Sequence, residues 1–537
     1  MRKIATFLAS AAALLSIGKG SCSAQSAIPS SVAPLFTSDI IVESNTTANQ
    51  RNVRVASAFN GWMFAAYIVN DSISNKGGVV VRYSKNGGIN WMPFNNYPYF
   101  QHSNYQACDI TVTGADTNHL SVFVGMVRKD HTTKKFEVEV ERYNAMHTAY
   151  PSVVVFFQQL DTNGVTDLAL ANDYKQPAPT DSAYSIGLLY AHHGTSMDSV
   201  LFATTEKRLK NKFGKPTLIA AGAHYRKVSI AYLHSMSITG AYCAAWESLD
   251  SVKSTYGHIL FSRTMSKLDS AWTKPVYLDS LRPATVNKLR SPSISCQYNA
   301  VDNDSANATA AVAFDYYNGT DHDILGYYNK KADSANFWNL FVVTNSSNNE
   351  IQPNLSFDPT ANNFVATYYD STAKGLTYSN QSMLFSTPIA WNFVTWQYNS
   401  NTNLKAPWPR VVMNQLTHKA FFAWVMDPAN GNGVVLCNGD YLYTGISEQE
   451  VSGLQFLNPY PNPANSGSVL PVSSDIPVTL NISIYNAMGQ LVNCSSEHFG
   501  GGVKLIDLNT SSFAPGIYVC RIATSDHAVT RRLIVEH

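Results

Sequence analysis

Phe364-Val365-Ala366-Thr367-Tyr368-Tyr369-Asp370 is an apolar run that ends in a polar turn, and it lies inside a unit that the chain repeats. A short strand is predicted to begin near Pro353 ahead of this run, a third run ends at Tyr378-Ser379, and Trp391 opens a fourth run. Short apolar runs separated by Asn, Asp and Gly turns are typical of β-strands. The stretch from Pro353 to Trp391 therefore predicts a unit of four short strands.

The same unit recurs along residues 35–446. Its first strand is predicted to begin near Val53, Asp109, Asp167, Pro216, Pro292, Pro353 and Pro409. The second run is clearest at 228–232, 311–314, 364–368 and 421–424, and the fourth run opens at Trp91, Trp272, Trp338 and Trp391. One such unit cannot bury both of its faces alone, whereas units stacked in a ring bury them all.

We therefore predict an all-β fold, a β-propeller of seven blades, or of six if the irregular stretch 160–215 is not a blade. Two β-sandwiches in series are the competing fold. Asp39-Ile40-Ile41-Val42 is predicted to form a strand of the last blade, which would close the ring and protect the edge of that blade.

One turn of the predicted propeller carries the motif Ser84-Lys85-Asn86-Gly87-Gly88-Ile89-Asn90-Trp91. It resembles the Asp-box, or BNR repeat, of sialidase-type propellers, Ser-x-Asp-x-Gly-x-x-Trp, with Asn in place of Asp. Asn86 can bond its own backbone, a glycine adopts a positive φ, and Trp91 is expected to pack between blades. The resemblance gives Ser84, Asn86, Gly88 and Trp91 a structural role and says little about activity.

The last part of the chain contains four ordered motifs. They are Pro459-Tyr460-Pro461-Asn462-Pro463-Ala464, the run 482–492 around Asn486-Ala487-Met488-Gly489-Gln490, Ala514-Pro515-Gly516-Ile517-Tyr518-Val519 and Arg531-Arg532-Leu533-Ile534-Val535. Short strands with Gly and Asn between them predict a small β-sandwich at 455–537, after a linker at 447–454. The motifs resemble the type A C-terminal sorting domain of the type IX secretion system (Por) of Bacteroidetes. This resemblance implies the secretion machinery as a partner and a secreted or cell-surface location, reached through the periplasm.

The beginning of the chain agrees with export. Met1-Arg2-Lys3 is basic, residues 4–17 are apolar and small, and Cys22-Ser23-Ala24 offers the small residues that a signal peptidase needs. We predict a signal peptide at 1–24, the alternative being a lipoprotein anchored through Cys22. No other stretch is long and apolar enough for a transmembrane segment.

The composition narrows the possible functions. The net charge of +1 leaves no electrostatic footprint for nucleic acid. Charged residues make up 14% and aromatic residues 12% of the chain, which favours a β-rich fold with a large core. Beyond Cys22, six cysteines match no metal-binding spacing. Cys494 and Cys520 could pair within the sorting domain, and the others are expected to be buried.

We expect no cofactor and no metal. The doublet His192-His193 and the run Asp321-His322-Asp323 could suggest metal ligands, but both fall in predicted hairpin turns, where polar clusters are ordinary.

The resemblance to sialidases implies a test for catalysis. A sialidase needs three arginines around the substrate carboxylate, together with a tyrosine nucleophile, its glutamate partner and an acid/base residue. Arg54, Arg290 and Arg410 lie beside predicted innermost strands and are the candidate carboxylate-binding set, although Asn52-Val53-Arg54-Val55 lacks the usual frame of the family's first arginine. The alternative is three unrelated arginines paired with structural acids. Nothing in the spacing selects a catalytic residue among Asp109, Asp167, Glu247 and Asp315.

The other class of function is binding. Aromatic side chains in loops are the usual platforms for sugars, and the loop at 95–100 supplies Tyr97, Tyr99 and Phe100, with Trp396 and Trp408 as further candidates. The sequence favours a surface or extracellular module that binds a glycan or a protein. The alternative is an exo-acting glycoside hydrolase of sialidase type.

Overall fold

The computed structural model describes residues 39–536, except for a set of shorter stretches. These are 44–48, 72–75, 95–102, 115–119, 145–152, 174–184, 206–211, 235–239, 266–270, 282–287, 299–307, 334–336, 345, 359–362, 383–395, 400–403, 418, 428–431, 440–453, 457–458, 460–461, 475–476, 487–489, 501 and 525–527.

Seven four-stranded antiparallel sheets, the blades, lie within the described residues up to Gly439. Their first strands line a central channel. Blade 1 contains β2 (Asn49–Ser57), β3 (Met63–Asp71), β4 (Lys76–Ser84) and β5 (Met92–Pro93); blade 2 contains β6 (Ser103–Thr113), β7 (Ser121–Asp130), β8 (Phe136–Asn144) and β9 (Val153–Gln159); blade 3 contains β10 (Val165–Asn172), β11 (Ile186–His193), β12 (Asp198–Thr204) and β13 (Thr217–Gly222); blade 4 contains β14 (Tyr225–Leu233), β15 (Ala241–Ser248), β16 (His258–Arg263) and β17 (Val276–Tyr277). Blade 5 contains β18 (Leu289–Cys296), β19 (Ala310–Tyr317), β20 (His322–Asn329) and β21 (Asn339–Val342); blade 6 contains β22 (Glu350–Asp358), β23 (Asn363–Asp370), β24 (Gly375–Ser382) and β25 (Trp396–Gln397); blade 7 contains β26 (Arg410–Met413), β27 (Ala420–Met426), β28 (Val434–Gly439) and β1 (Ile40–Ile41). One 3₁₀ turn, η2 (Asp279–Leu281), follows β17.

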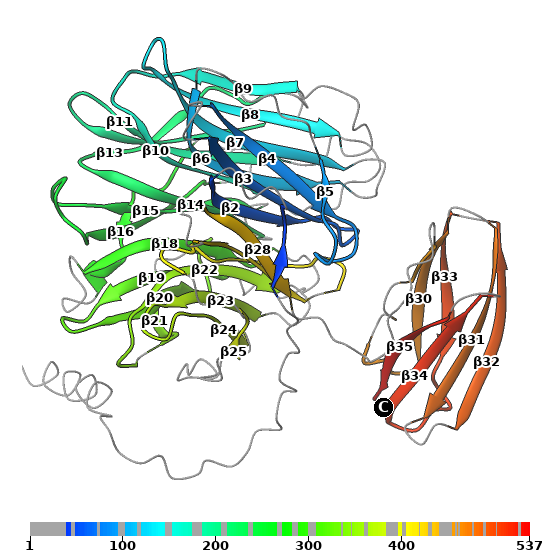
Figure 1. Cartoon of the computed structure of the whole chain (residues 1–537). Helices are drawn as coiled ribbons and strands as arrows, with labels where there is room; N and C mark the ends of the chain where they lie inside the picture. The colour runs from blue at the N-terminus through cyan, green and yellow to red at the C-terminus, as the bar shows by residue number, and fades with distance from the viewer. Residues whose placement is uncertain are drawn as a thin grey trace, which may run out of the picture.

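The ring is closed by the N-terminal strand. β1 pairs with β28, with Ile40 opposite Cys437 and Ile41 opposite Leu436, and in Figure 1 β28 comes back beside β2. One buried core joins Val53 and Tyr67 of blade 1 to residues of blade 7. The predicted seven-bladed propeller is confirmed, the predicted strand near residues 39–42 pairs with the last blade as β1, and the stretch 160–215 does form a blade.

The predicted assignment of strands to blade 4 was wrong. Pro216 precedes β13, which pairs with β12 and is the outer strand of blade 3. The run 228–232, which the sequence suggested as a second strand, belongs to β14, the inner strand of blade 4. Only Ala223 and His224 separate β13 from β14, so the sequence shows no long turn at the boundary between the two blades.

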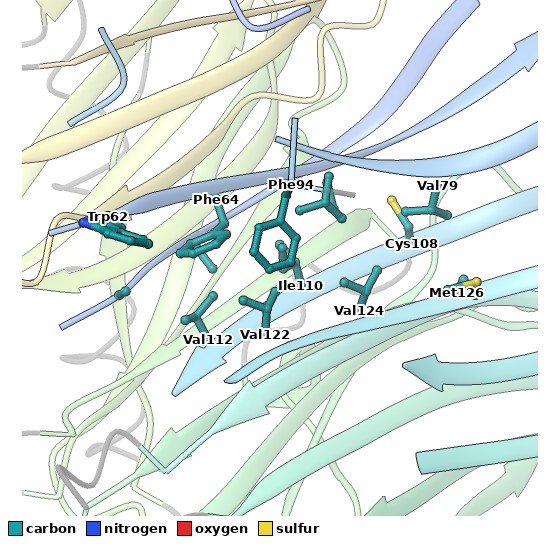
Figure 2. Close-up of a cluster of buried hydrophobic side chains, with 14 of the residues drawn as sticks. Trp62, Phe64, Val79, Phe94, Cys108, Ile110, Val112, Val122, Val124 and Met126 are labelled. Atoms are coloured by element: carbon teal, nitrogen blue, oxygen red, sulfur yellow. The ribbon is translucent and has the colours of Figure 1, made fainter. Parts of the chain in front are cut away.

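The blades are held together by apolar contacts between their faces. Figure 2 shows Phe64 and Phe94 of blade 1 facing Ile110, Val122 and Val124 of blade 2. Each of these side chains is at most 5% exposed, and full burial of a large apolar side chain contributes about 1.5–3 kcal/mol. Because a blade is covered on both faces, its middle strands are apolar almost throughout, as in β15, which is buried at every residue.

The inner strands share a β-bulge near their beginning. The register shifts between Arg51 and Arg54 in β2, and equivalent shifts occur in β14, β18 and β22. In each of these four strands, a residue with positive φ lies two positions before the first paired residue after the bulge: Asn52, Lys227, Ser291 and Gln352. Trp408, which also has a positive φ, lies two positions before the first residue of β26. A bulge bends its strand and re-aims the following side chains, so residues before and after it face different surroundings.

The motif 84–91 has the local geometry that its residue types predict. The Gly88 amide donates to Ser84 Oγ at 2.8 Å and the Asn90 amide donates to Asn86 Oδ1 at 2.9 Å. Gly87 and Gly88 have φ values of 71° and 107°. The Trp91 indole donates to Gly88 O at 2.9 Å, and its ring lies 5.9 Å from Phe421 of blade 7. The loop therefore links the first and last blades.

The C-terminal part contains two further sheets. One consists of β29 (Leu454–Phe456), β30 (Gly467–Ser474) and β33 (Gly502–Asn509), and the other of β31 (Val478–Asn486), β32 (Leu491–Phe499), β34 (Gly516–Ala523) and β35 (Ala528–Val535). A single core joins Leu470 and Ile506 of the first sheet to Ile482 and Ile522 of the second, so the predicted β-sandwich is confirmed.

Cysteine 494 and cysteine 520 do not form a disulfide. Both thiols are free. Cys494 lies on β32 and Cys520 on β34, on either side of β31. Cys494 is exposed and Cys520 is buried, so the two thiols occupy different surroundings. The suggested pair is therefore not present, while Cys108, Cys243, Cys296 and Cys437 are buried as expected.

Candidate functional site

A cavity of about 600 Å³ lies along the channel and is lined by the first strands of all seven blades. The residues that line the cavity include seven with charged side chains. The cationic lining residues are Arg51, Arg54, Lys227 and Arg410, and the carboxylates are Asp109, Asp167 and Asp427. Within the described lining, the cationic groups therefore exceed the carboxylates by one.

Arg54 stands between two of the carboxylates. Its Nε lies 3.7 Å from Asp109 Oδ1 and its Nη2 lies 3.9 Å from Asp167 Oδ1. Asp109 also accepts the amide of Leu170 at 2.7 Å, which ties blade 2 to blade 3. Burial raises the pKa of Asp109, and the charge of Arg54 opposes that rise. These contacts fix Arg54 in the channel without a close ion pair.

Arg410 is a cationic side chain whose buried guanidinium group is not fully satisfied by hydrogen bonds. Burial and, after it, the charge of the neighbouring Arg54 lower its pKa to about 9, while Asp167 and Asp109 act in the opposite direction. Its Nε is buried and has no hydrogen-bond partner among the described residues. A buried donor left without an acceptor costs about 1–3 kcal/mol, and because Arg410 also lines the cavity, its guanidinium is a candidate partner for an acceptor group there.

Lys227 and Trp408 meet at the same end of the channel. The Lys227 ammonium lies 4.4 Å from the centroid of the Trp408 ring, and burial lowers the pKa of Lys227. Trp408 has a φ of 44°, an uncommon conformation for a bulky residue, and its amide donates to Gln352 Oε1 at 2.9 Å. Backbone strain of this kind is found mainly at functional sites.

Arg290 does not join Arg54 and Arg410. It is not part of the cavity lining, and its Nε donates to Asp315 Oδ2 at 2.7 Å. Asp315 is fully buried and also contacts His322 Nδ1 at 2.8 Å. The expected group of three arginines is therefore reduced to two in this structure.

The bulge explains this separation. Arg290 precedes the bulge of β18 and pairs across the blade with Asp315, just as Arg226 of β14 pairs with Glu247. Arg54 follows the bulge of β2, and Arg410 follows Trp408 by two residues. Arg226 and Arg290, just before their bulges, therefore meet acids of their own blade, whereas Arg54 and Arg410 line the channel.

Other residues singled out from the sequence do not converge on this site. Tyr97, Tyr99 and Phe100 lie outside the described residues, as does the side chain of Trp396. His192 contacts Asp161 and His193 contacts Asp198, so each histidine has its own acid. No group of three or more His, Cys, Asp or Glu residues that could hold a metal ion occurs in the described ranges.

Lys227 was not among the residues predicted from the sequence to form the site. Its position two residues before Ser229 matches that of Asn52 before Arg54 and of Trp408 before Arg410. That alignment becomes visible once β14 is recognised as the inner strand of blade 4. Trp408 is the aromatic candidate whose side chain the structure describes, and it lines the same cavity as Arg54 and Arg410.

Solved structures with similar folds are distant in sequence. An α-L-arabinofuranosidase from Fusarium graminearum is 12% identical, with 75% of this chain and 97% of that chain covered and a TM-score of 0.43. A lectin from Aleuria aurantia, described as a six-bladed β-propeller with a fucose recognition mode, is 11% identical, with coverages of 67% and 98% and a TM-score of 0.35. A Hadza microbial sialidase is 10% identical, with coverages of 60% and 63% and a TM-score of 0.36. A search of curated proteins found no match.

The C-terminal part of the chain matches a known family of domains. Residues 458–536 match the family model described as the secretion system C-terminal sorting domain, which agrees with the motifs in the sequence. Among the described residues, no helix has the length and apolar character needed to cross a membrane. The chain is therefore an exported cargo whose C-terminal sorting domain engages the type IX secretion machinery and directs it to the cell surface or the extracellular space.

Proposed function

We propose that the propeller is an extracellular binding module and that its channel binds an acidic group of a glycan. One observation carries this proposal: Arg54 and Arg410 share a cavity of about 600 Å³, and the buried Nε of Arg410 has no hydrogen-bond partner among the described residues. Two guanidinium groups side by side repel each other unless an anion lies between them.

The chemistry of the cavity suits a carboxylate or a sulfate ester. A guanidinium group offers planar, paired donors that match such an oxyanion. The lining has one more cationic side chain than carboxylates, so a ligand with a single negative charge would balance it. Bound there, the anion would also favour the charged form of Arg410, whose pKa burial lowers to about 9.

Trp408 provides the second element of a sugar site. Aromatic rings stack on the apolar C–H faces of sugars, and Trp408 is two residues from Arg410 and lines the same cavity. A sugar ring on Trp408 would therefore place its acidic substituent among Arg410, Arg54 and Lys227. This combination favours an acidic glycan over a neutral one.

The test is a binding titration by calorimetry with acidic oligosaccharides and with their neutral counterparts. We expect binding of the acidic ligands, and at least tenfold weaker binding by Arg410→Gln, which is about 1.4 kcal/mol. Lys274→Gln is the control, because it removes a positive charge from an exposed position ahead of the outer strand β17. Equal binding of neutral ligands, or an unaffected Arg410→Gln variant, would contradict the proposal.

A glycoside hydrolase is the second candidate. Asp109 and Asp167 both lie near Arg54, and the raised pKa of Asp109 is what a general acid requires. A sialidase-type mechanism would also need a tyrosine beside the arginines. Tyr232 lines the cavity but lies five residues along β14 from Lys227, roughly 16 Å at the rise of a strand.

A hydrolysis assay separates the two candidates. The protein would be incubated with a sialoside and with aryl glycosides of uronic acids, and the released sugar would be measured. We expect no turnover. Turnover that Asp109→Asn abolishes would replace the binding role by catalysis.

A further inference from the structure

A second site with unsatisfied polar groups lies away from the channel, between blades 5 and 6. Asp323 stands near the beginning of β20 and Glu350 at the beginning of β22. Each residue is only 4% exposed. Neither carboxylate lines the channel cavity, and neither forms an ion pair within the part of the chain that the structure describes.

Each of these two carboxylates has one satisfied and one unsatisfied oxygen. Asp323 Oδ2 accepts the side-chain amide of Asn318 at 3.0 Å, and Glu350 Oε1 accepts the hydroxyl of Ser346. Asp323 Oδ1 and Glu350 Oε2 are buried and have no hydrogen-bond partner among the described residues. Buried polar atoms are nearly always paired, so two such oxygens at one place call for an explanation.

Ser346 brings the two carboxylates together. Its backbone amide hydrogen-bonds to the Asp323 carboxylate, and its hydroxyl donates to Glu350. The two acids thus flank a single residue although they come from neighbouring blades. Ser346 itself is exposed, so the two buried carboxylates lie beside a residue at the surface.

The electrostatics of the pair are unfavourable without a counter-charge. Burial is the largest cause that raises the pKa of Asp323 to about 6 and that of Glu350 to about 7, and the charge of Asp323 adds to the rise at Glu350. Asp321 and Asp370 contribute further repulsion. His322 faces Asp323 with the opposite effect, but its ring nitrogens contact Asp315 and Tyr256.

We propose that Asp323 Oδ1 and Glu350 Oε2 are ligands of a Ca²⁺ ion that bridges blades 5 and 6. The oxygen atoms available at the pair belong to the two carboxylates and to the hydroxyl of Ser346, and such ligands suit a hard cation and do not suit zinc. Water would complete the coordination from the exposed side at Ser346. With two protein carboxylates, the expected affinity lies in the range of extracellular calcium modules, about 10⁻⁴–10⁻³ M.

The alternative explanation is a proton held between the two carboxyl groups. It predicts no response to calcium. A proton and a Ca²⁺ ion would compete for the same oxygens, so calcium binding should weaken as the pH falls through the range in which the pair takes up protons.

The test uses the exported protein with its sorting domain, freed of metal by EDTA and gel filtration. Thermal unfolding is followed with and without 10 mM CaCl₂ at pH 8 and at pH 5. We expect Ca²⁺ to raise the Tm by roughly 2 °C or more at pH 8, and clearly less at pH 5. Direct binding is followed by Tb³⁺ luminescence, because Tyr316, which pairs with Asp323 across β19 and β20, is placed to sensitise a lanthanide at this site.

Glu350→Gln and Asp323→Asn are expected to abolish both signals while the protein stays folded. Asp250→Asn is the control, because that carboxylate belongs to blade 4 and its side chain is 57% exposed. The proposal is overturned if the wild-type protein shows neither signal, or if both persist in Glu350→Gln. Failure here would leave the proposed glycan site untouched, since the two sites share no residue.

Discussion

The ammonium group of Lys227 lies 4.4 Å from the centroid of the Trp408 ring, although Lys227 belongs to blade 4 and Trp408 immediately precedes blade 7. These blades are on opposite sides of the ring, so the two side chains meet across the channel. A cation–π contact of this kind contributes about 0.5–2 kcal/mol, depending on its exposure to solvent. Any ligand that stacks on Trp408 therefore has to accommodate the lysine.

Trp408→Asn should separate stability from binding. Asn tolerates a positive φ better than Trp does, so relief of backbone strain should offset the lost ring contact and keep the free energy of unfolding within about 1 kcal/mol of the wild type. Trp424→Ala, by contrast, empties a fully buried site and should cost about 3–5 kcal/mol. Thermal unfolding and glycan titration of both variants check this, and a large destabilisation by Trp408→Asn would show that the tryptophan is structural.

The Asn at position 86 should be replaceable by Asp. Asn86 Oδ1 accepts the Ser84 hydroxyl at 2.8 Å and the Asn90 amide at 2.9 Å, and a carboxylate accepts both bonds more strongly. Asn86→Asp should therefore unfold at the wild-type Tm or above, whereas Asn86→Ala should lose about 0.5–1.5 kcal/mol. Calorimetric scans of the two variants give the answer. A destabilised Asn86→Asp would argue against the Asp-box resemblance.

Closure of the ring can be tested at Val42. Its amide donates to Val435 O at 3.1 Å, and its side chain is 4% exposed. Val42→Pro removes the donor and should lower the Tm more than Val42→Ala, which keeps the amide and loses only packing. An opened ring would also present the edge of β28, so we expect dimers or aggregates in size-exclusion chromatography. Equal behaviour of the two variants would mean that β1 contributes little to closure.

The thiols of the folded protein should differ in reactivity. Cys494 is exposed, whereas Cys520 is buried and burial raises its pKa to about 11. Burial likewise raises the pKa of Cys108 and that of Cys437 to about 12. Iodoacetamide should therefore add one group to the native mature protein, and intact-mass spectrometry counts it. No addition without reductant, and two after reduction, would instead indicate a disulfide.

Glu350 should make the calcium-free protein less stable as the pH rises. Its pKa is about 7 in the folded state against an ordinary value of 4.5, so the folded state binds more protons than the unfolded state between these pH values. The free energy of unfolding should therefore fall between about pH 4.5 and pH 7, on the order of 2 kcal/mol in all. Glu350→Gln should flatten this part of the pH profile in urea titrations, and an unchanged slope would assign the dependence to other groups.

Local sequence patterns were enough to predict most of the architecture. The recurring apolar runs, the tryptophans before the fourth strands, the closing strand at 39–42 and the C-terminal motifs each depend on residues that are close together in the chain. Strand alternation and turn chemistry act over a few residues, which is why such features can be predicted. The exception was blade 4, where the two-residue connection Ala223-His224 hides the boundary between two equally apolar strands.

The candidate sites could not be predicted in the same way, because the residues that form each site come from different blades. Arg54, Arg290 and Arg410 all lie on inner strands, yet the first two line the channel and the third is held by Asp315. Lys227 with Trp408, and Asp323 with Glu350, are neighbours only because the ring brings their strands together. The sequence by itself determined that a propeller of six or seven blades forms and how the protein is exported, and the structure decided for seven. The tertiary structure alone decided which charges meet, because that depends on the register of each strand and on the closure of the ring.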